Sequence, residues 1–187
     1  MRQLTDPSRH HRPPPLQPHA SYAGTVIWLL ASCAIEPCAD TGLSAGTCAQ
    51  ELEATDLGGA AWRLSEQRGD VVLVSFVAGW CIDCQDASAE QAVLDRYRAE
   101  GLQVVEVLVE DAQGGRVSSD EAAAWHARIA PELTVLFDPQ REAWRAWKAD
   151  GTGFPLSYLV TREGEIGWRH FGGGDEAWLD DKVAPWL

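Results

Sequence analysis

The chain has 187 residues, a length that fits one domain with a tail better than two domains. Hydrophobic residues make up 45% and charged residues 23%, which is ordinary for a globular protein and argues against an intrinsically disordered or membrane-spanning chain. The net charge of -13 is uneven: residues 1–32 hold three Arg and one Asp, which leaves 12 basic against 27 acidic residues, or -15, in the rest. Such an acidic body repels nucleic acid and anionic lipid, so we expect neither as a partner.

Residues 1–33 have the pattern of an export signal. Three arginines within the first 12 residues precede an apolar run over residues 23–31, which is too short to span a bilayer. The run ends in Leu30-Ala31-Ser32-Cys33, which resembles the bacterial lipoprotein signal. The resemblance implies lipidation at Cys33, and a protein held on the periplasmic side of the cell envelope by its lipid alone. The alternative is an incidental cysteine behind a misassigned start.

Residues 34–50 are rich in small side chains and are predicted to tether the lipid anchor to a domain that begins at residue 51. Disulfides persist in oxidising compartments outside the cytoplasm. We therefore predict a structural disulfide between Cys38 and Cys48, which would stabilise this short loop by about 2 to 3 kcal/mol. A regulatory or exchange role for the pair is the alternative.

The first half of the domain predicts a hairpin followed by a strand, a helix and a strand. Residues 54–64, with two glycines in the middle, are typical of a short hairpin. Residues 71–77 and 103–109 are apolar runs typical of strands buried on both faces. Between them, residues 82–100 have helical spacing, with Gly101 as the C-terminal cap. Two strands joined by a helix run parallel, with a right-handed crossover.

The second half continues the alternation. Helices are predicted over residues 118–129, from Asp138-Pro139 through residue 147, and over residues 175–186. A short strand is expected at residues 134–137, and an antiparallel hairpin over residues 156–160 and 166–171. The whole pattern predicts an α/β fold with a mixed central sheet between flanking helices.

Cys81 and Cys84 stand at the start of the predicted helix over residues 82–100. A thiol attacks disulfides as thiolate, and the N-terminus of a helix stabilises that charge. We expect Cys81 to be the exposed nucleophile and Cys84 to be more buried and to resolve the mixed disulfide. The two residues are therefore the predicted catalytic pair, and two structural thiols or a static disulfide are the alternative.

Zinc ribbons use the same cysteine spacing, but they need two further ligands. Cys38 and Cys48 are too widely spaced to be such a pair, and His126 and His170 are isolated. We therefore expect no metal site and no cofactor.

Several segments resemble the thioredoxin superfamily, and specifically its exported TlpA/ResA-like thiol-disulfide oxidoreductases, or redoxins. They are residues 71–84, Gly153-Phe154-Pro155, the hairpin over residues 157–171 and Gly172-Gly173. The resemblance spans about residues 51–187. It implies a thioredoxin-like three-layer fold that exchanges disulfides with exported protein clients. Its expected partners are protein thiols and disulfides and an upstream electron donor, and the expected state is a monomer.

The same resemblance assigns roles around the cysteines. Trp80 matches a tryptophan that precedes the first cysteine, and Pro155 matches a cis-proline that faces the disulfide and leaves the backbone of Phe154 free to pair with a substrate. Core packing and an ordinary trans proline are the alternatives. Asp83 replaces the proline of the commonest motif, and its charge should oppose a second negative charge nearby and favour a more reducing centre.

This chain departs from its relatives at two positions that matter for the proton that Cys84 must lose. Thioredoxins carry a buried Asp where this chain has Ser75, and ResA-like proteins often carry a Glu where it has Ala87. The sequence leaves Asp86, Glu110 and bulk water as alternative proton acceptors.

Three other functions remain open at the sequence level. A peroxiredoxin-like (AhpC/TSA) peroxide reductase needs Pro and Thr ahead of its reactive cysteine, and residues 77–79 supply neither. A copper-binding chaperone would use the thiols as metal ligands, and only His170 supports it. A non-catalytic binding module would hold its partner through Phe154 and the tryptophans without turnover.

Overall fold

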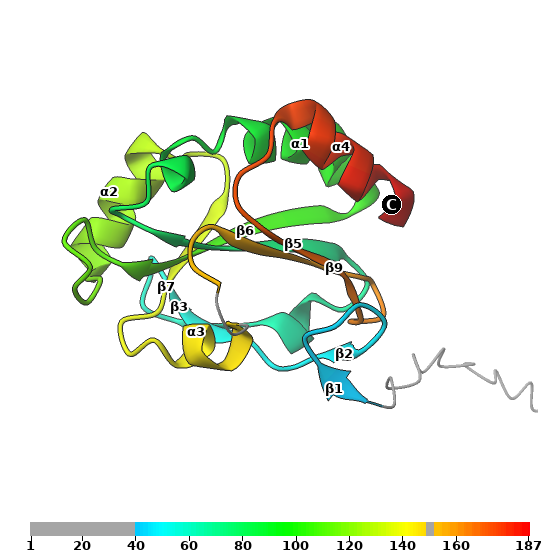
Figure 1. Cartoon of the computed structure of the whole chain (residues 1–187), viewed down its shortest axis with the longest axis horizontal. Coiled ribbons are helices and arrows are strands. Elements are labelled where there is room, and N and C mark those ends of the chain that lie inside the picture. Colours follow the sequence, from blue (N-terminus) through cyan, green and yellow to red (C-terminus); the bar gives the residue numbers. More distant parts are fainter. Residues whose placement is uncertain (1–39, 149–151) are drawn as a thin grey trace, which may run out of the picture. The chain divides into compact units, whose positions relative to one another are not determined.

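The computed structural model describes residues 40–148 and 152–187, and its centre is a mixed sheet of seven strands (Figure 1). β5 (Val71–Ala78), β6 (Leu102–Glu110) and β7 (Thr134–Phe137) run parallel to one another. Four antiparallel strands extend this core, with β3 (Glu53–Asp56) and β4 (Ala61–Arg63) beyond β7, and β8 (Leu156–Val160) and β9 (Ile166–Phe171) beyond β5. The predicted strands and hairpins are confirmed.

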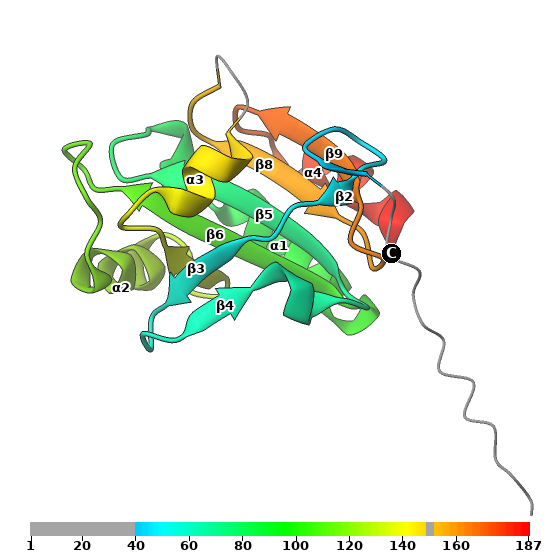
Figure 2. The same ribbon diagram turned by 90° about the horizontal axis from the view of Figure 1, so that it is seen from below.

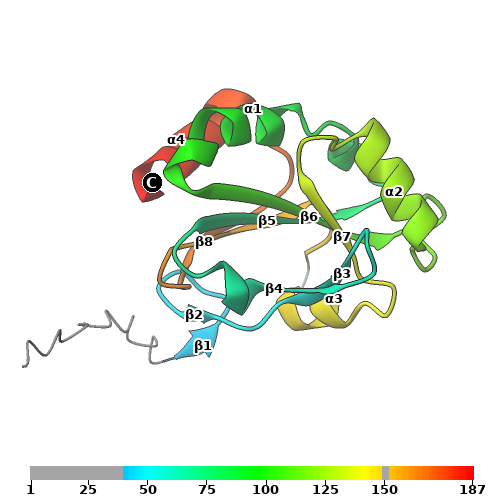
Figure 3. The same ribbon diagram turned by 180° about the vertical axis from the view of Figure 1, so that it is seen from behind.

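Helices cover both faces of the sheet (Figures 1 and 3). Residues of α1 (Ser88–Tyr97), α2 (Ser119–Arg128) and α4 (Glu176–Val183) form one core cluster with β5 and β6. α3 (Glu142–Trp147) supplies Trp144 and Trp147 to a second cluster on the opposite face. Because both clusters cover β5, all eight of its residues are buried, as its apolar sequence predicts.

The helix predicted over residues 82–100 is interrupted. Asp83–Gln85 form a short 3-10 turn, η2, and Asp86 then adopts an extended conformation before α1 begins at Ser88. The Asp86 carboxylate accepts a hydrogen bond from the Ser88 N–H at 3.0 Å, a local bond that competes with helical pairing. A second 3-10 turn, η3 (Arg98–Glu100), ends at the predicted cap, Gly101, whose φ is 85°.

One other helix start and the end of the last helix differ from the prediction. α3 begins at Glu142 and not at Asp138, because the Asp138 carboxylate accepts hydrogen bonds from the N–H groups of Glu142 and Trp144, both at 2.9 Å. At the C-terminus, Asp175 caps α4, and the chain ends in a 3-10 turn, η4 (Ala184–Trp186).

Residues 40–50 are attached to the hairpin formed by β8 and β9 (Figure 2). β1 (Thr41–Gly42) and β2 (Cys48–Ala49) pair in parallel, and the Ala49 N–H donates to the Gly164 carbonyl at 2.9 Å. The second half of the predicted tether therefore packs on the sheet domain, with Cys48 buried. Cys33 and Cys38 lie outside the described residues, so lipidation and the pairing with Cys48 stay predictions. Within residues 40–148 and 152–187, none of the helices has the length and apolar character that a bilayer crossing requires.

Candidate redox site

Cys81 and Cys84 are joined by a disulfide directly after β5, with their Cα atoms 5.2 Å apart. The exposed fractions of the two residues are 5% and 4%. The expectation of an exposed Cys81 beside a more buried Cys84 is therefore wrong for this oxidised form, because the bond holds both residues in the same core cluster. The exposed residue between the two cysteines is the apolar Ile82, which is 85% exposed.

The turn that carries the cysteines depends on a close backbone approach at Gly79. A Cβ added there would lie 2.7 Å from the backbone nitrogen of Ala112, so a side chain would displace the turn. The Cys84 N–H points at the Cys81 sulfur over 3.2 Å. An N–H donor in this position favours a negative charge on that sulfur.

The expectation that the pair lies at the N-terminus of the long helix is only partly met. Because Asp86 separates η2 from α1, the dipole of α1 does not begin at Cys81. The local Cys84 N–H takes the role that the sequence assigns to the helix.

The Phe154-Pro155 peptide bond is cis, as the resemblance implies, so the trans alternative is wrong. Phe154 lies between two tryptophans, stacked on Trp144 with ring centroids 4.4 Å apart and in edge contact with Trp80 at 5.9 Å. The fold thus brings Phe154 into contact with Trp80, the residue that precedes Cys81, although the two are far apart in the sequence.

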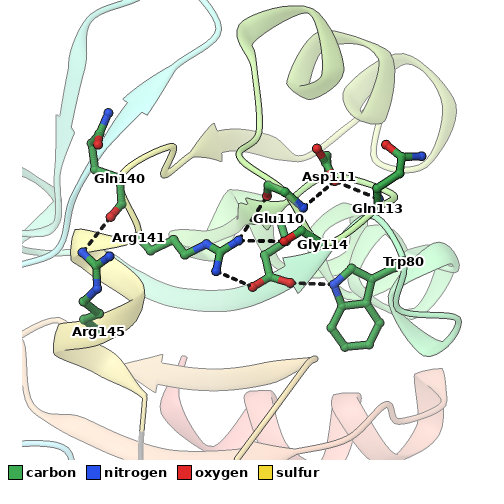
Figure 4. A network of polar contacts seen from close by, with 9 residues as sticks. Trp80, Glu110, Asp111, Gln113, Gly114, Gln140, Arg141 and Arg145 are labelled. Carbon is green, nitrogen blue, oxygen red and sulfur yellow. Dashed lines mark hydrogen bonds and ion pairs between the residues drawn. The ribbon is translucent and has the colours of Figure 1, made fainter.

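Trp80 belongs to a polar network that reaches α3 (Figure 4). Trp80 is 49% exposed, so core packing does not explain it. The Trp80 Nε1–H donates to Glu110 Oε2 at 2.6 Å, and Glu110 Oε1 lies 3.1 Å from Arg141 Nη1. Arg141 also donates to the Gly114 carbonyl at 2.8 Å. Glu110 is therefore committed to orienting Trp80, which weakens it as the proton acceptor for Cys84.

Sequence reasoning missed one residue of the site, Glu106. It is 2% exposed and lines a cavity of about 40 Å³ together with Cys84, Pro155 and Ser157. Burial raises the pKa of Glu106 to about 8, although a hydrogen bond from the Trp125 Nε1–H at 2.5 Å favours its ionised form. The signal was present, since Glu106 is an acidic residue within the apolar run over residues 102–109.

The other members of the site are placed as follows. Asp83 lies in the first turn of η2. It lines the same cavity as Glu106, and Asp86, Glu90 and His170 line that cavity too. Hydrogen bonds from Ser88 lower the pKa of the exposed Asp86, and burial raises the pKa of Glu90. Among the described residues, no group of three or more His, Cys, Asp or Glu side chains is arranged to hold a metal ion.

Comparison with known proteins agrees with this geometry. The model of the AhpC/TSA family matches residues 45–169. The chain is 24% identical to the thiol-disulfide oxidoreductase ResA of Geobacillus kaustophilus over 127 residues, which are 67% of this chain and 68% of ResA. It is 28% identical to the thiol:disulfide interchange protein CycY of Rhizobium leguminosarum bv. viciae over 120 residues, 63% of this chain and 59% of CycY.

A solved structure is similar as well. The crystal structure of a putative thiol:disulfide interchange protein DsbE from Chlorobium tepidum superposes with a TM-score of 0.66 at 28% identity, covering 77% of this chain and 98% of that one. The likeness confirms the predicted thioredoxin-like fold. The relatives are thiol-disulfide oxidoreductases, so the peroxide reductase has less support although the family name includes it. The chain belongs to the AhpC/TSA family, and within it to the thiol-disulfide oxidoreductases of the ResA, CycY and DsbE kind.

Proposed function

We propose that this protein exchanges disulfides with exported protein clients through Cys81 and Cys84. The observation that carries the proposal is the disulfide between the two cysteines after β5, with Cys84 lining the same cavity as Pro155. The two sulfurs have different roles, since one can attack a client disulfide and the other, one turn away, can resolve the mixed disulfide that forms.

The exchange runs in two steps. In the reduced protein the Cys81 thiolate attacks a client disulfide, forming a mixed disulfide and releasing one client sulfur as thiolate. The Cys84 thiolate then attacks the Cys81 sulfur, which forms the Cys81–Cys84 disulfide and releases the second client thiolate. Two electrons pass from the protein to the client, and an upstream dithiol returns them.

The client is proposed to bind on the apolar surface beside the disulfide. Trp80 and Ile82 are exposed there, and Phe154 packs against the edge of Trp80. An extended client segment can pair with the backbone of Phe154 while its side chains contact these rings. Asp83 adds a negative charge to this surface, which disfavours acidic client segments.

Export and lipidation at Cys33 belong to the same proposal. They are supported by the arginines and the apolar run of residues 1–33 and by the ResA, CycY and DsbE relatives. A lipid anchor would keep the redox site at a membrane surface while the folded domain reaches its clients.

The test is reduction of insulin by the full chain, recycled by dithiothreitol. We expect the wild type to accelerate the reaction and both Cys81→Ser and Cys84→Ser to lose at least about tenfold of the rate, because each removes one sulfur of the cycle. Cys33→Ser is the matched control, since it removes a cysteine outside the site. It should keep the activity and lose its partition into detergent.

The proposal would be wrong if wild-type protein failed to reduce insulin while it consumed hydrogen peroxide. The Cys84→Ser variant adds a direct readout, because it should accumulate mixed disulfides on Cys81 whose attached proteins identify the clients.

A further inference from the structure

Glu106 is a buried carboxyl group that the exchange described above does not yet use. It lies in the middle of β6, where it pairs in register with Ser75 of β5 and faces the same core cluster as Val104 and Leu108. A carboxyl group in such a position costs stability unless it is protonated or paired, so its presence calls for a use.

The cavity between Glu106 and Cys84 gives the two groups a route to each other. Both residues line it, and its volume of about 40 Å³ exceeds the 10 to 15 Å³ or so that a water molecule needs. The cavity wall also contains polar groups that can hold water, among them the Ser157 hydroxyl and the His170 imidazole. The cavity that Glu106 and Cys84 both line therefore has room for water.

The two carboxylates that the sequence left open as acceptors, Glu110 and Asp86, are less suited to this role. Glu110 binds Trp80 and Arg141, and it does not line this cavity. Asp86 lines it, but hydrogen bonds from Ser88 lower its pKa, which makes it a weak base for a thiol. Ser75 and Ala87, at the positions where relatives carry acids, have no carboxyl group.

We propose that Glu106 is the group that exchanges a proton with Cys84, through water in the shared cavity, during thiol-disulfide exchange. The inference rests on the proposed function and names the proton-transfer group of that reaction. It places the acid on the neighbouring strand β6, opposite the position on β5 where thioredoxins carry theirs.

The steps balance in both directions. When an upstream thiolate attacks the Cys81 sulfur, the bond between Cys81 and Cys84 breaks, Cys84 leaves as a thiolate, and the Glu106 carboxylic acid gives it a proton. When the protein reduces a client, the Glu106 carboxylate takes the proton of the Cys84 thiol. The resulting thiolate attacks the Cys81 sulfur of the mixed disulfide, and the client leaves as a thiolate.

The proton affinity of Glu106 suits this role. Its pKa of about 8, raised by burial, leaves it protonated at neutral pH in the oxidised protein, ready to donate. The charged and titratable groups around the cavity are Asp83 and Asp86 near η2, Glu90 on α1 and His170 on β9. Glu90 raises the pKa of Glu106 further by repulsion, whereas the Trp125 hydrogen bond from α2 lowers it.

Ellman's reagent separates the two steps, because reduced protein releases one thionitrobenzoate when Cys81 attacks and a second when Cys84 resolves. We expect Glu106→Gln to slow the second release at least about tenfold at pH 7 and to leave the first unchanged within about twofold, since only the second step needs a base for Cys84. The wild-type second step should also show an inflection with pH that the variant lacks. Glu132→Gln, which removes an exposed carboxylate, is the matched control and should behave as wild type.

Two further variants protect the test against misfolding of Glu106→Gln. Glu106→Asp keeps a carboxyl group and should recover part of the rate. Trp125→Phe removes the hydrogen bond that favours the ionised form, so the inflection should move to higher pH. The role of Glu106 would be overturned if the second thionitrobenzoate release kept its rate and pH profile in Glu106→Gln, or if the inflection did not move in Trp125→Phe. Either result would leave the proposed function standing. Absence of a second release in wild type would overturn the proposed function itself.

Discussion

Glu106 shows how one residue can set the pH response of this protein. Its carboxyl group is buried among apolar side chains of β6, and Trp125 is its hydrogen-bond donor. Such a site favours the neutral acid, whereas in the unfolded chain the same group ionises near its ordinary pKa of 4.5. The folded protein therefore binds more protons than the unfolded chain between these two values.

This linkage predicts a loss of stability with rising pH. Because the folded-state pKa of Glu106 is raised to about 8, its ionisation opposes folding increasingly from about pH 4.5 to pH 8. We expect the free energy of unfolding of the oxidised wild type, relative to Glu106→Gln, to fall by about 4 kcal/mol from pH 5 to pH 9, since a tenfold change in proton affinity is worth about 1.4 kcal/mol. Urea denaturation at several pH values measures it, and parallel pH profiles for the two proteins would contradict it.

Trp80 illustrates a different control at the residue scale. Its exposed ring would be free to rotate, but the hydrogen bond to Glu110 and the ion pair with Arg141 fix its edge beside Phe154. Arg141 itself has a φ of 56°, uncommon for a residue other than glycine, and its guanidinium holds the loop at Gly114. The network thus positions an apolar wall of the redox site from the start of α3.

At the scale of elements, side-chain caps decide where helices begin. The interruption at Asp86 and the late start of α3 after Asp138 both come from carboxylates that accept backbone N–H groups. The apolar periodicity over residues 82–100 extends across the break, which is why the sequence predicts one helix. Capping of this kind depends on the local backbone path, which periodicity does not report.

The start of α2 offers a direct measurement of such a cap. Ser118 and Glu121 form a capping box, in which the Ser118 hydroxyl accepts from the Glu121 N–H and the Glu121 carboxylate accepts from the Ser118 N–H. We expect Ser118→Ala to lower the free energy of unfolding by about 1 kcal/mol, measured by chemical denaturation. The neighbouring exposed Ser119→Ala should change it by less than about 0.5 kcal/mol, and equal effects of the two would argue against the cap.

At the scale of the whole molecule, Arg162 ties the far end of the sheet together. Its guanidinium donates to the carbonyls of Gly69 at 2.8 Å and Glu100 at 2.6 Å, which precede β5 and β6, and to that of Leu187 at 3.4 Å. One side chain thus links the hairpin of β8 and β9, two strand starts and the C-terminus. This clamp lies at the opposite ends of the strands from Cys81, so it should affect stability without affecting the exchange chemistry.

We expect Arg162→Ala to lower the free energy of unfolding by about 2 to 3 kcal/mol, because it leaves carbonyls without their charged donor. The rate of insulin reduction at 25 °C should stay within about twofold of wild type. Arg128→Ala is the matched control, since the exposed Arg128 side chain makes no hydrogen bond or ion pair with any residue in 40–148 or 152–187, and it should be nearly neutral. Urea denaturation of the two variants and the wild type measures these differences, from midpoints compared at an unchanged dependence of the free energy of unfolding on urea concentration.

The sequence by itself determined the order of strands and helices, the cysteine pair at the end of a buried strand and the cis-proline site. Each depends on residues close together in the chain, such as the apolar run over residues 71–77 or the spacing of Cys81 and Cys84. The resemblance to redoxins was readable for the same reason, since its motifs are short and local.

Only the tertiary structure decided which side chains surround the sulfurs. Glu106 lines the same cavity as Cys84 because β6 pairs with β5 in a register that puts it opposite Ser75, and because residues of α1 and α4 complete the cavity wall. Glu110 is one of several acceptors that the sequence leaves open, and the fold places it between Trp80 and Arg141. Contacts of this kind depend on sheet register and helix packing over long sequence separations, and no local pattern of residues specifies them.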